Sequence, residues 1–282
     1  MKPAPFAYVR AESLEHAVDV LREHGDEAKP LAGGQSLVPA LNMRLARPSV
    51  VVDLNRLVGL DAIAVDNGSI SIGALARQSS TLRAELVREQ CPLLAEALGF
   101  VGHAVTRNRG TVGGSIAHAD AAAELPLALV TLGGSVVTSR RVLVADELFV
   151  ASFITALEPD ELLLSTKWPA RRPGEGSAFQ EFAPRYGDFA LAAAACNLRV
   201  ENGVVAEARL AVNAVTQRPE LVDTASLVGH TVDDEAAREL GGTVAAMVDP
   251  PPNLHGSPEY RRSLVATLVA RAVTRAWERA AA

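Results

Sequence analysis

The sequence predicts an α+β protein with two domains, on three observations. The first fifty residues alternate between helical and extended hydrophobic patterns. Residues 169–176 gather proline, glycine and charged side chains, which is typical of a linker. Beyond them, extended segments follow one another directly and helices return near the C-terminus, as in an antiparallel meander covered by helices.

Length, composition and charge exclude several classes of protein. The chain has 282 residues, against a usual size of roughly 150 per domain. Its 49% apolar and 21% charged residues indicate a folded globular protein, and its net charge of −6 argues against nucleic acid as a partner. We expect neither a signal peptide nor a transmembrane segment, and therefore a cytoplasmic location.

The N-terminal elements come in the order helix, strand, glycine turn, helix, strand. Ser13 is a candidate cap for a helix that Gly25 ends, and a strand follows over Lys29–Ala32. After Gly33 and Gly34, Ser36 is a candidate cap for a helix through Leu45, and the strand Val50–Asp53 closes the unit.

The middle of the chain alternates strands with helices. A strand is predicted around 69–72, helices over 80–87 and 92–100, a polar glycine-rich loop over 106–115, a helix over 121–133 and short strands over 136–150. After the linker, strands are expected over 179–182, 190–200 and 204–215, the last two joined by a hairpin turn at Asn202-Gly203. The final helix starts at Ser257-Pro258 and should leave Arg271, Arg275 and Arg279 on its solvent side.

Cysteine and histidine usage predicts no metal site. Two cysteines, Cys91 and Cys196, are too few for a disulfide framework, a zinc ribbon or a protein-ligated iron–sulfur cluster. The six histidines lack metal-binding spacing. No nucleophile with a base partner stands out, so we predict no catalytic residue in this chain.

Two glycine pairs are the most informative local feature. Gly33-Gly34-Gln35-Ser36 and Gly113-Gly114-Ser115 each precede a helical segment, where free backbone N–H groups can bind phosphate oxygens. Either pair alone could simply make a turn, but together they favour a dinucleotide. Neither fits the Rossmann fingerprint or the P-loop. Arg107 and Arg109 could add charge to such a site or could be ordinary surface residues.

These residues resemble a known family. Leu31-Ala-Gly-Gly-Gln-Ser-Leu37, Arg109-Gly-Thr-Val-Gly-Gly-Ser115, Ala119-Asp120 and Glu124-Leu-Pro126 are similar to the FAD-binding medium subunit of molybdenum hydroxylases, such as aerobic carbon monoxide dehydrogenase and the flavin domain of xanthine dehydrogenase. The resemblance extends over the whole chain, through Leu157–Leu163 and Arg185–Ala190.

The resemblance implies a fold and a set of cofactor-binding residues. It implies a bilobal FAD-binding domain of the vanillyl-alcohol-oxidase (PCMH) type over 1–170, with lobes at about 1–55 and 56–170, and a C-terminal domain with an antiparallel sheet and helices over 171–282. The implied FAD-binding residues are Ala32, Gly33, Gly34, Gln35, Ser36, Leu37, Thr111, Val112, Gly113, Gly114, Ser115, Asp120, Glu124, Leu164 and Phe189. Gln35 stands where several relatives have histidine, so a histidyl–flavin bond cannot form there and FAD should be non-covalent.

The resemblance also implies a divided reaction. A large molybdopterin-binding subunit would hydroxylate the substrate, a small subunit with [2Fe-2S] clusters would relay electrons, and this chain would collect them on FAD for an external acceptor such as NAD, oxygen or a quinone. The complex would be a dimer of heterotrimers. Carbon monoxide, purines, N-heterocycles and aldehydes all remain open as substrates.

Two other interpretations remain open at the level of sequence. The chain could be a stand-alone flavin oxidoreductase of the same fold group, for which Arg185, Tyr186 and Asp188 are the only candidate acid or base residues. It could also be a nucleotide-binding or assembly protein with no redox role.

Overall fold

The structure, a computed structural model, describes residues 2–252 and 254–282. The α-helices are α1 (Leu14–His24), α2 (Leu37–Asn42), α3 (Gln78–Arg83), α4 (Glu85–Gln90), α5 (Pro92–Phe100), α6 (Ala104–Arg109), α7 (Val112–His118), α8 (Glu124–Leu132), α9 (Ala145–Leu148), α10 (Asp234–Met247) and α11 (Pro258–Ala281). The strands are β1 (Ala7–Arg10), β2 (Ala28–Leu31), β3 (Val50–Asp53), β4 (Ile63–Asp66), β5 (Ser69–Gly73), β6 (Ser135–Thr138), β7 (Val142–Val144), β8 (Phe149–Ala151), β9 (Ile154–Thr155), β10 (Leu163–Pro169), β11 (Glu175–Phe182), β12 (Ala192–Glu201), β13 (Val204–Asn213) and β14 (Glu220–Val222).

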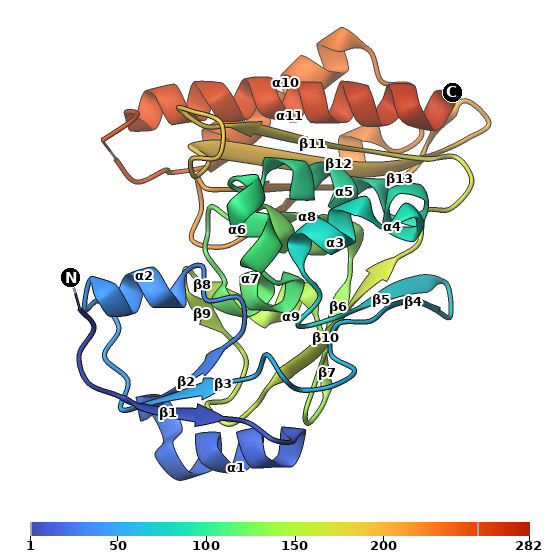
Figure 1. Cartoon of the computed structure of the whole chain (residues 1–282). Helices are drawn as coiled ribbons and strands as arrows, with labels where there is room; N and C mark the ends of the chain where they lie inside the picture. The colour runs from blue at the N-terminus through green and yellow to red at the C-terminus, as the bar shows by residue number, and fades with distance from the viewer. Residues whose placement is uncertain (1, 253) are drawn as a thin grey trace.

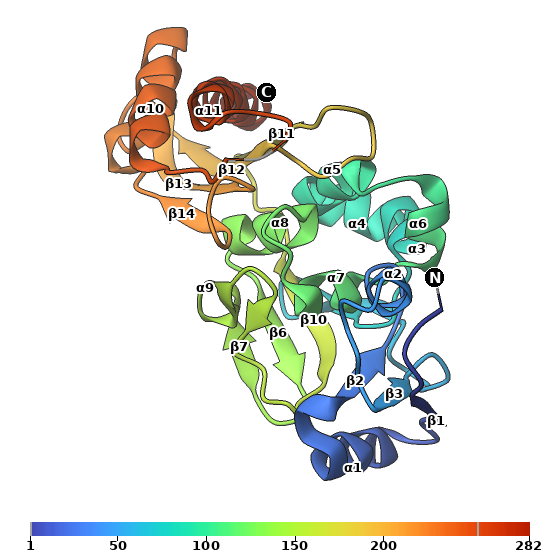
Figure 2. The same ribbon diagram turned by 90° about the vertical axis from the view of Figure 1, so that its left-hand side faces the viewer.

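The N-terminal lobe is a small parallel sheet in the order β1-β3-β2, with α1 on one side and α2 at the other end (Figures 1 and 2). Ser13 caps α1 as predicted, because its hydroxyl accepts the N–H of His16 at 3.1 Å. Ala17 and Leu21 of α1 pack on the central strand in one hydrophobic cluster. The lobe is therefore held by a compact core of its own.

The second lobe is an antiparallel sheet in the order β4-β5-β10-β6-β7, with helices α3 to α8 above it (Figure 1). Ile70, Ile72 and Trp168 are fully buried between this sheet and the helices. Gly133, at φ +64, ends α8 in the left-handed conformation that glycine adopts at low cost.

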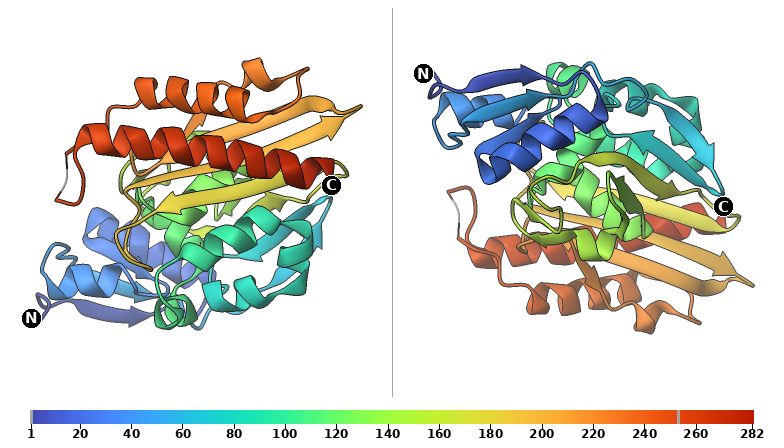
Figure 3. Two further views of the ribbon diagram at one scale, coloured as in Figure 1. Left: turned by 90° about the horizontal axis from the view of Figure 1, so that it is seen from above. Right: turned by 90° about the horizontal axis from the view of Figure 1, so that it is seen from below.

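The C-terminal sheet has the antiparallel order β11-β12-β13-β14 and is buried on both faces. Helices α10 and α11 run side by side across one face (Figure 3), while α5 and α8 pack on the other. Small side chains on β12 allow other elements to pack closely on both faces of the sheet. Ala192, Ala194 and Cys196 face the C-terminal helices, whereas Ala193 and Ala195 face the second lobe. One core cluster therefore joins the second lobe to the C-terminal sheet.

Several expected elements are confirmed. The turn Asn202-Gly203, with both residues at positive φ, joins β12 to β13, and Ser257 caps the long α11, whose Val265, Leu268 and Val269 are buried.

Other expectations were wrong in detail. The region predicted as one helix over 80–87 forms α3 and α4, and the loop predicted over 106–115 is largely helical, as α6 and the start of α7. Ser36 has helical dihedral angles and makes no side-chain cap, and α2 ends at Asn42 instead of reaching Leu45. Arg279 does not simply point to solvent, because it pairs with Glu96 of α5 at 2.8 Å.

Candidate cofactor-binding site

The first glycine loop presents a row of free backbone donors. Among the described residues, the N–H groups of residues 33 to 37 find no acceptor, and the loop opens on a cleft of about 420 Å³. Gly34 has φ +73, a conformation that favours glycine. Gln35 and Ser36 are exposed, and the Gln35 amide donates to the carbonyl of Gly33 at 3.3 Å. Free N–H groups ahead of α2 can receive an anionic group.

The second loop uses its amides differently. The N–H groups of Val112 and Gly113 donate to Ala76 and Ala74, and those of Gly114 and Ser115 bond to Thr111. Thr111 caps α7 through its hydroxyl, at 3.0 Å from the amide nitrogen of Gly114. The sequence-based expectation of free N–H groups therefore holds for the first loop and fails for residues 112–115.

The two loops touch each other although 79 residues separate Gly34 from Gly113. A Cβ on Gly33 would lie 2.5 Å from the carbonyl oxygen of Arg109 and 2.8 Å from the Cα of Gly110. No side chain fits there, so glycine allows the two backbones to pack directly. Leu164 lies at the bulge in β10, accepts the N–H of Ala74 at 2.8 Å and packs in the same cluster as Ala32.

Asn55 and Arg77 hold the loop pair together. The Asn55 amide donates to the carbonyl of Ala32 in the first loop at 2.8 Å. Arg77 donates to the Asn55 side-chain oxygen at 2.7 Å and to the carbonyl of Arg109 beside the second loop at 2.5 Å. One chain of hydrogen bonds thus fixes the distance between the loops.

Asp53 and Tyr8, both from the N-terminal lobe, orient the side chain of Asn55. Asp53 accepts the Asn55 amide at 2.6 Å and the hydroxyl of Tyr8. Burial raises the pKa of Asp53, but the hydrogen bonds from Tyr8 and Asn55 outweigh it and lower that pKa, so the carboxylate stays ionised. Sequence reasoning missed these residues; the polar pair at the carboxyl end of β3 was the one available signal for Asp53 and Asn55.

Two guanidinium groups lie at the junction of the loops. Arg109 lines the cleft and makes no ion pair within the described part of the chain. Burial, and then the charge of Arg109, lower the pKa of Arg77. Neighbouring cations beside a row of free N–H donors favour an anionic ligand.

Asp120 and Glu124 lie elsewhere, at the connection between α7 and α8. Asp120 accepts the N–H of Ala122 at 2.9 Å. Burial raises the pKa of Glu124 to about 7; a backbone hydrogen bond and the charge of Arg107 oppose this shift, and the charge of Asp120 adds to it. Phe189 is 71% exposed in the connection between β11 and β12. The loop-pair cleft does not include these three residues.

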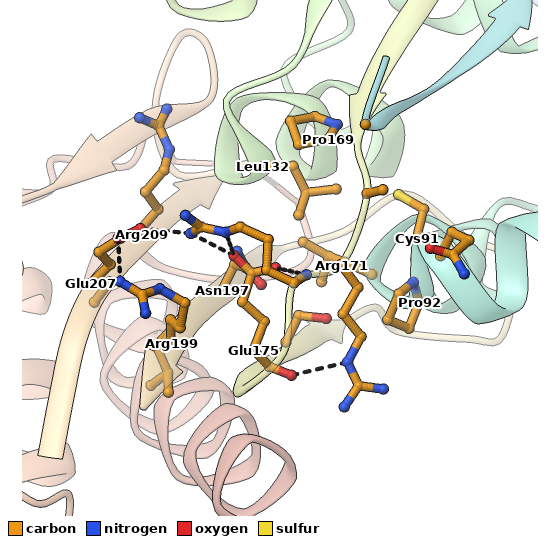
Figure 4. Close-up of a pocket in the computed structure, with 18 residues that line it drawn as sticks. Cys91, Pro92, Leu132, Pro169, Arg171, Glu175, Asn197, Arg199, Glu207 and Arg209 are labelled. Atoms are coloured by element: carbon orange, nitrogen blue, oxygen red, sulfur yellow. Dashed lines mark hydrogen bonds and ion pairs between the residues drawn. The ribbon is translucent and has the colours of Figure 1, made fainter. Parts of the chain in front are cut away.

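A second cavity, of about 300 Å³, lies between α5, β10 and the C-terminal sheet (Figure 4). Four of its charged side chains pair with one another: Arg172 bonds Glu175 and Glu207, and Arg199 bonds Glu207, all at 2.6 Å. Arg209 donates to the last carbonyls of α8 and to Asp146. We interpret the charged residues that line this cavity as a structural ion-pair network.

The candidate acid and base residues do not converge. Asp188 and Arg185 are joined by a backbone turn, and the Tyr186 hydroxyl donates to the carbonyl of Gly99 at 3.3 Å.

Cys91 and Cys196 are buried free thiols, and burial raises the pKa of each to about 12. Within residues 2–252 and 254–282 there is no cluster of potential metal ligands, and no helix is long and apolar enough to cross a membrane.

Known protein families match nearly the whole chain. Residues 4–171 match the family described as the FAD binding domain in molybdopterin dehydrogenase, and residues 177–276 match the CO dehydrogenase flavoprotein C-terminal domain. A similar relative is the 6-hydroxypseudooxynicotine dehydrogenase complex subunit alpha of Paenarthrobacter nicotinovorans, which is 39% identical over 99% of this chain and 97% of its own.

Solved structures agree with the sequence comparison. Carbon monoxide dehydrogenase from Hydrogenophaga pseudoflava superposes with a TM-score of 0.96 at 32% identity over 99% of both chains. Quinoline 2-oxidoreductase from Pseudomonas putida 86 gives 0.94 at 34% identity, again over 99% of both chains. The fold is thus the bilobal FAD-binding domain followed by the C-terminal domain that the sequence predicted. The chain belongs to the FAD-binding medium subunits of the molybdenum hydroxylases, a family of oxidoreductases.

Proposed function

We propose that this chain is the electron-transfer subunit of a molybdenum-containing hydroxylase or dehydrogenase. It would take electrons from iron–sulfur clusters of a partner subunit onto non-covalent FAD and pass them to an external acceptor. The observation that carries the proposal is the pair of contacting glycine loops, one of which offers five consecutive free N–H groups beside Arg109.

The residues present fit the pyrophosphate of FAD. The free amides of residues 33 to 37 supply directed donors, and Arg109 and Arg77 supply positive charge at the junction with the second loop. Thr111 to Ser115 would form the second wall, with Gly113 packed on Ala74 and Leu164 alongside. Asp120, Glu124 and Phe189 would lie toward the flavin ring.

The chain would act by holding and tuning its cofactor. Bound FAD would supply the redox chemistry, because a flavin accepts electrons singly and passes on two. The chain would orient the pyrophosphate through backbone amides and hold the loops at a fixed spacing through Asn55 and Arg77. With glutamine at position 35, FAD would be held without a histidyl bond.

The proposed partners are a large molybdopterin-binding subunit and a small [2Fe-2S] subunit, assembled as a dimer of heterotrimers in the cytoplasm. The sequence similarity to medium subunits of several such enzymes supports this arrangement. We also propose domain limits of 1–170, with lobes at about 1–55 and 56–170, and 171–282, in line with the two matched family regions.

Flavin binding by Arg109→Gln tests the assigned site. The apo chain is titrated with FAD, and the dissociation constant is taken from the loss of flavin fluorescence. The variant should bind about ten- to a hundredfold more weakly, since a charge-assisted hydrogen bond contributes roughly 1.5–3 kcal/mol. Arg275→Gln, at an exposed position of α11, serves as the matched control. Equal affinity of the Arg109 variant and wild type would remove Arg109 from the site.

A further inference from the structure

The loop between β11 and β12, residues 183–191, extends from the C-terminal sheet to the helices of the second lobe (Figure 2). At its base the N–H of Leu191 donates to the carbonyl of Phe182 at 2.8 Å. At its tip the N–H of Asp188 donates to the carbonyl of Arg185 at 3.1 Å, which closes a turn. Backbone hydrogen bonds therefore define both the base and the tip of this loop.

Gly187, at the tip, lies directly against the side chain of His103. A Cβ on Gly187 would lie 2.5 Å from Cε1 and 2.7 Å from Nδ1 of the imidazole, so a residue without a side chain is needed for this contact. The backbone of Gly187 has φ +83, a conformation that also favours glycine. Two independent features thus require glycine at this position.

Tyr186 adds two further contacts between the tip and the second lobe. The centroid of its ring lies 5.8 Å from that of the His103 imidazole, and the two rings are tilted by 38°. Its hydroxyl donates to the carbonyl of Gly99, near the end of α5, at 3.3 Å. His103 therefore touches two consecutive residues of the tip, and the tip is anchored between the end of α5 and the start of α6.

Helix α6 connects this anchor to the two glycine loops. His103 directly precedes the helix, and Arg109 is its last residue. The carbonyl of Arg109 accepts from Arg77 at 2.5 Å and would lie 2.5 Å from a Cβ on Gly33, so this end of α6 belongs to the loop pair. The helix has six residues and is therefore about 9 Å long. A dinucleotide bound at the loop pair can span that distance.

Phe189 follows the anchored tip and is 71% exposed. Only Asp188 separates it from Gly187, so a displacement of the tip would move Phe189 as well. Residues that contact a ligand are often on loops that a rigid scaffold holds in place. Here the scaffold is the end of α5 and the start of α6, and His103 is the side chain that contacts the tip.

We propose that His103 is a positioning residue for the flavin. Its contacts with Tyr186 and Gly187 hold the β11–β12 loop on α6 and thereby fix Phe189 beside the isoalloxazine ring. The role toward the flavin rests on the proposed function, which puts Phe189 near the ring, whereas the anchoring of the loop does not. His103 acts through the loop and not by touching the cofactor.

The first test needs no flavin and measures the anchoring. Limited proteolysis of the apo chain with chymotrypsin, at Tyr186 and Phe189, follows the population of the open loop. His103→Ala should be cleaved there about three- to tenfold faster than wild type, as expected for one lost aromatic pair. His103→Phe, which keeps an aromatic ring, and His230→Ala, at an exposed position, should both be cleaved like wild type. Equal cleavage of His103→Ala and wild type would overturn the proposal.

Gly187→Ala tests the same contact from the loop side and replaces His103→Ala should that variant not fold. Its methyl group would occupy the place of the imidazole, so cleavage should again rise. The double variant should show less than the sum of the two effects, because both single changes break one contact. Full additivity would mean that His103 and Gly187 act on the loop separately, which contradicts the proposal.

The second test follows bound FAD. Visible circular dichroism of the flavin reports packing around its ring, and fluorescence titration gives the dissociation constant. His103→Ala should change the dichroism in the same direction as Phe189→Ala, and His103→Phe should restore the wild-type signal. The dissociation constant should change by less than about threefold, because the free amides of residues 33 to 37 still bind the pyrophosphate.

The outcomes of the two tests separate the anchoring from the role toward the flavin. A wild-type dichroism spectrum in His103→Ala or in Phe189→Ala would overturn the positioning role. If proteolysis behaves as expected but neither wild type nor any variant binds FAD, the proposed function fails, and the role of Phe189 toward the flavin fails with it, while the anchored loop stands.

Discussion

Asn55 decides how the two glycine loops meet, although it belongs to neither. Its amide donates to Ala32, and its oxygen accepts from Arg77, which also donates to the carbonyl of Arg109. Removing the amide would break the hydrogen-bonded link between Ala32 of the first loop and Arg77. A single side chain two residues beyond β3 thus controls the shape of the cleft.

Asn55→Ala should weaken FAD binding by about tenfold, since a lost hydrogen bond of this kind is worth about 1 kcal/mol and its partners remain partly buried. Fluorescence titration of the apo chain measures the effect. Asn108→Ala, at an exposed position of α6, is the control. Unchanged affinity in the Asn55 variant would show that the loops keep their spacing without it.

The sequence predicted which glycines belong to the two loops, but not every structural cause that requires glycine there. Gly34 is needed for its positive φ, whereas a Cβ on Gly113 would lie 2.5 Å from Cα of Ala74, a backbone that sequence spacing cannot reveal. Asn55 and Arg77 were missed because their importance comes from contacts across 22 to 32 residues. Local sequence motifs identify the glycine loops. The side chains that hold these loops in place are revealed only by hydrogen bonds between residues far apart in the sequence.

At the scale of elements, single buried side chains that hydrogen-bond to several groups hold the loops between helices and strands in place. Glu161, with its side chain fully buried, closes the turn between β6 and β7: it accepts from Thr138 at 2.6 Å, from Arg141 at 3.0 Å and from the N–H of Glu158 at 3.1 Å. Burial raises its pKa, but the bonds from Arg141 and Thr138 outweigh it and hold the pKa at about 2.

Glu161 should therefore make stability depend on acidic pH. A lowered pKa stabilises the folded state above the unfolded value of about 4.5, and this contribution is lost as pH falls toward 2. Glu161→Gln should lower the free energy of unfolding at pH 7 by roughly 2 kcal/mol and flatten its dependence between pH 4.5 and pH 2. Urea unfolding across that range measures both. Parallel pH profiles for the variant and wild type would contradict the assignment.

Arg261 plays a similar part for α11. Its guanidinium donates to the carbonyl of Leu191 at 3.0 Å and also to those of Pro251 and Ala214, so one buried side chain joins three connections at one end of the C-terminal sheet. Arg261→Met should lower the free energy of unfolding by about 3 kcal/mol or more, because three carbonyls lose their donor. Denaturant unfolding checks this against the exposed control Arg271→Met; a loss below 1 kcal/mol would contradict it.

Elements with their own end signals were predictable, and elements set by packing were not. The capped helix after Ser13, the helix after Ser257 and the hairpin at Asn202-Gly203 carry local signals. Residues 106–115 read as a loop because of their glycines, yet Thr111 caps a helix whose Val112 and Ile116 are buried in the second lobe. Tertiary burial overrides the low helix propensity of Gly113 and Gly114.

At the scale of the whole molecule, the C-terminal sheet shares one core with the second lobe. Leu125 and Leu129 of α8 belong to the same cluster as Phe179 and Ala211 of the sheet, so the two parts pack as one unit. In Figures 1 and 2, α8 lies between the C-terminal sheet and the sheet of the second lobe. The sequence predicted both parts but not this shared core, because the alternation in the alanine-rich β12 is hidden by alanine on both faces.

Purification from the native host with bound partners tests the proposed electron-transfer role most directly. If the chain has this role, it should show a visible flavin spectrum, release its flavin intact on denaturation, and co-purify with two chains, one large with molybdopterin and one small with iron–sulfur clusters. A chain that is colourless, or that carries flavin and turns over a substrate without any partner, would contradict it.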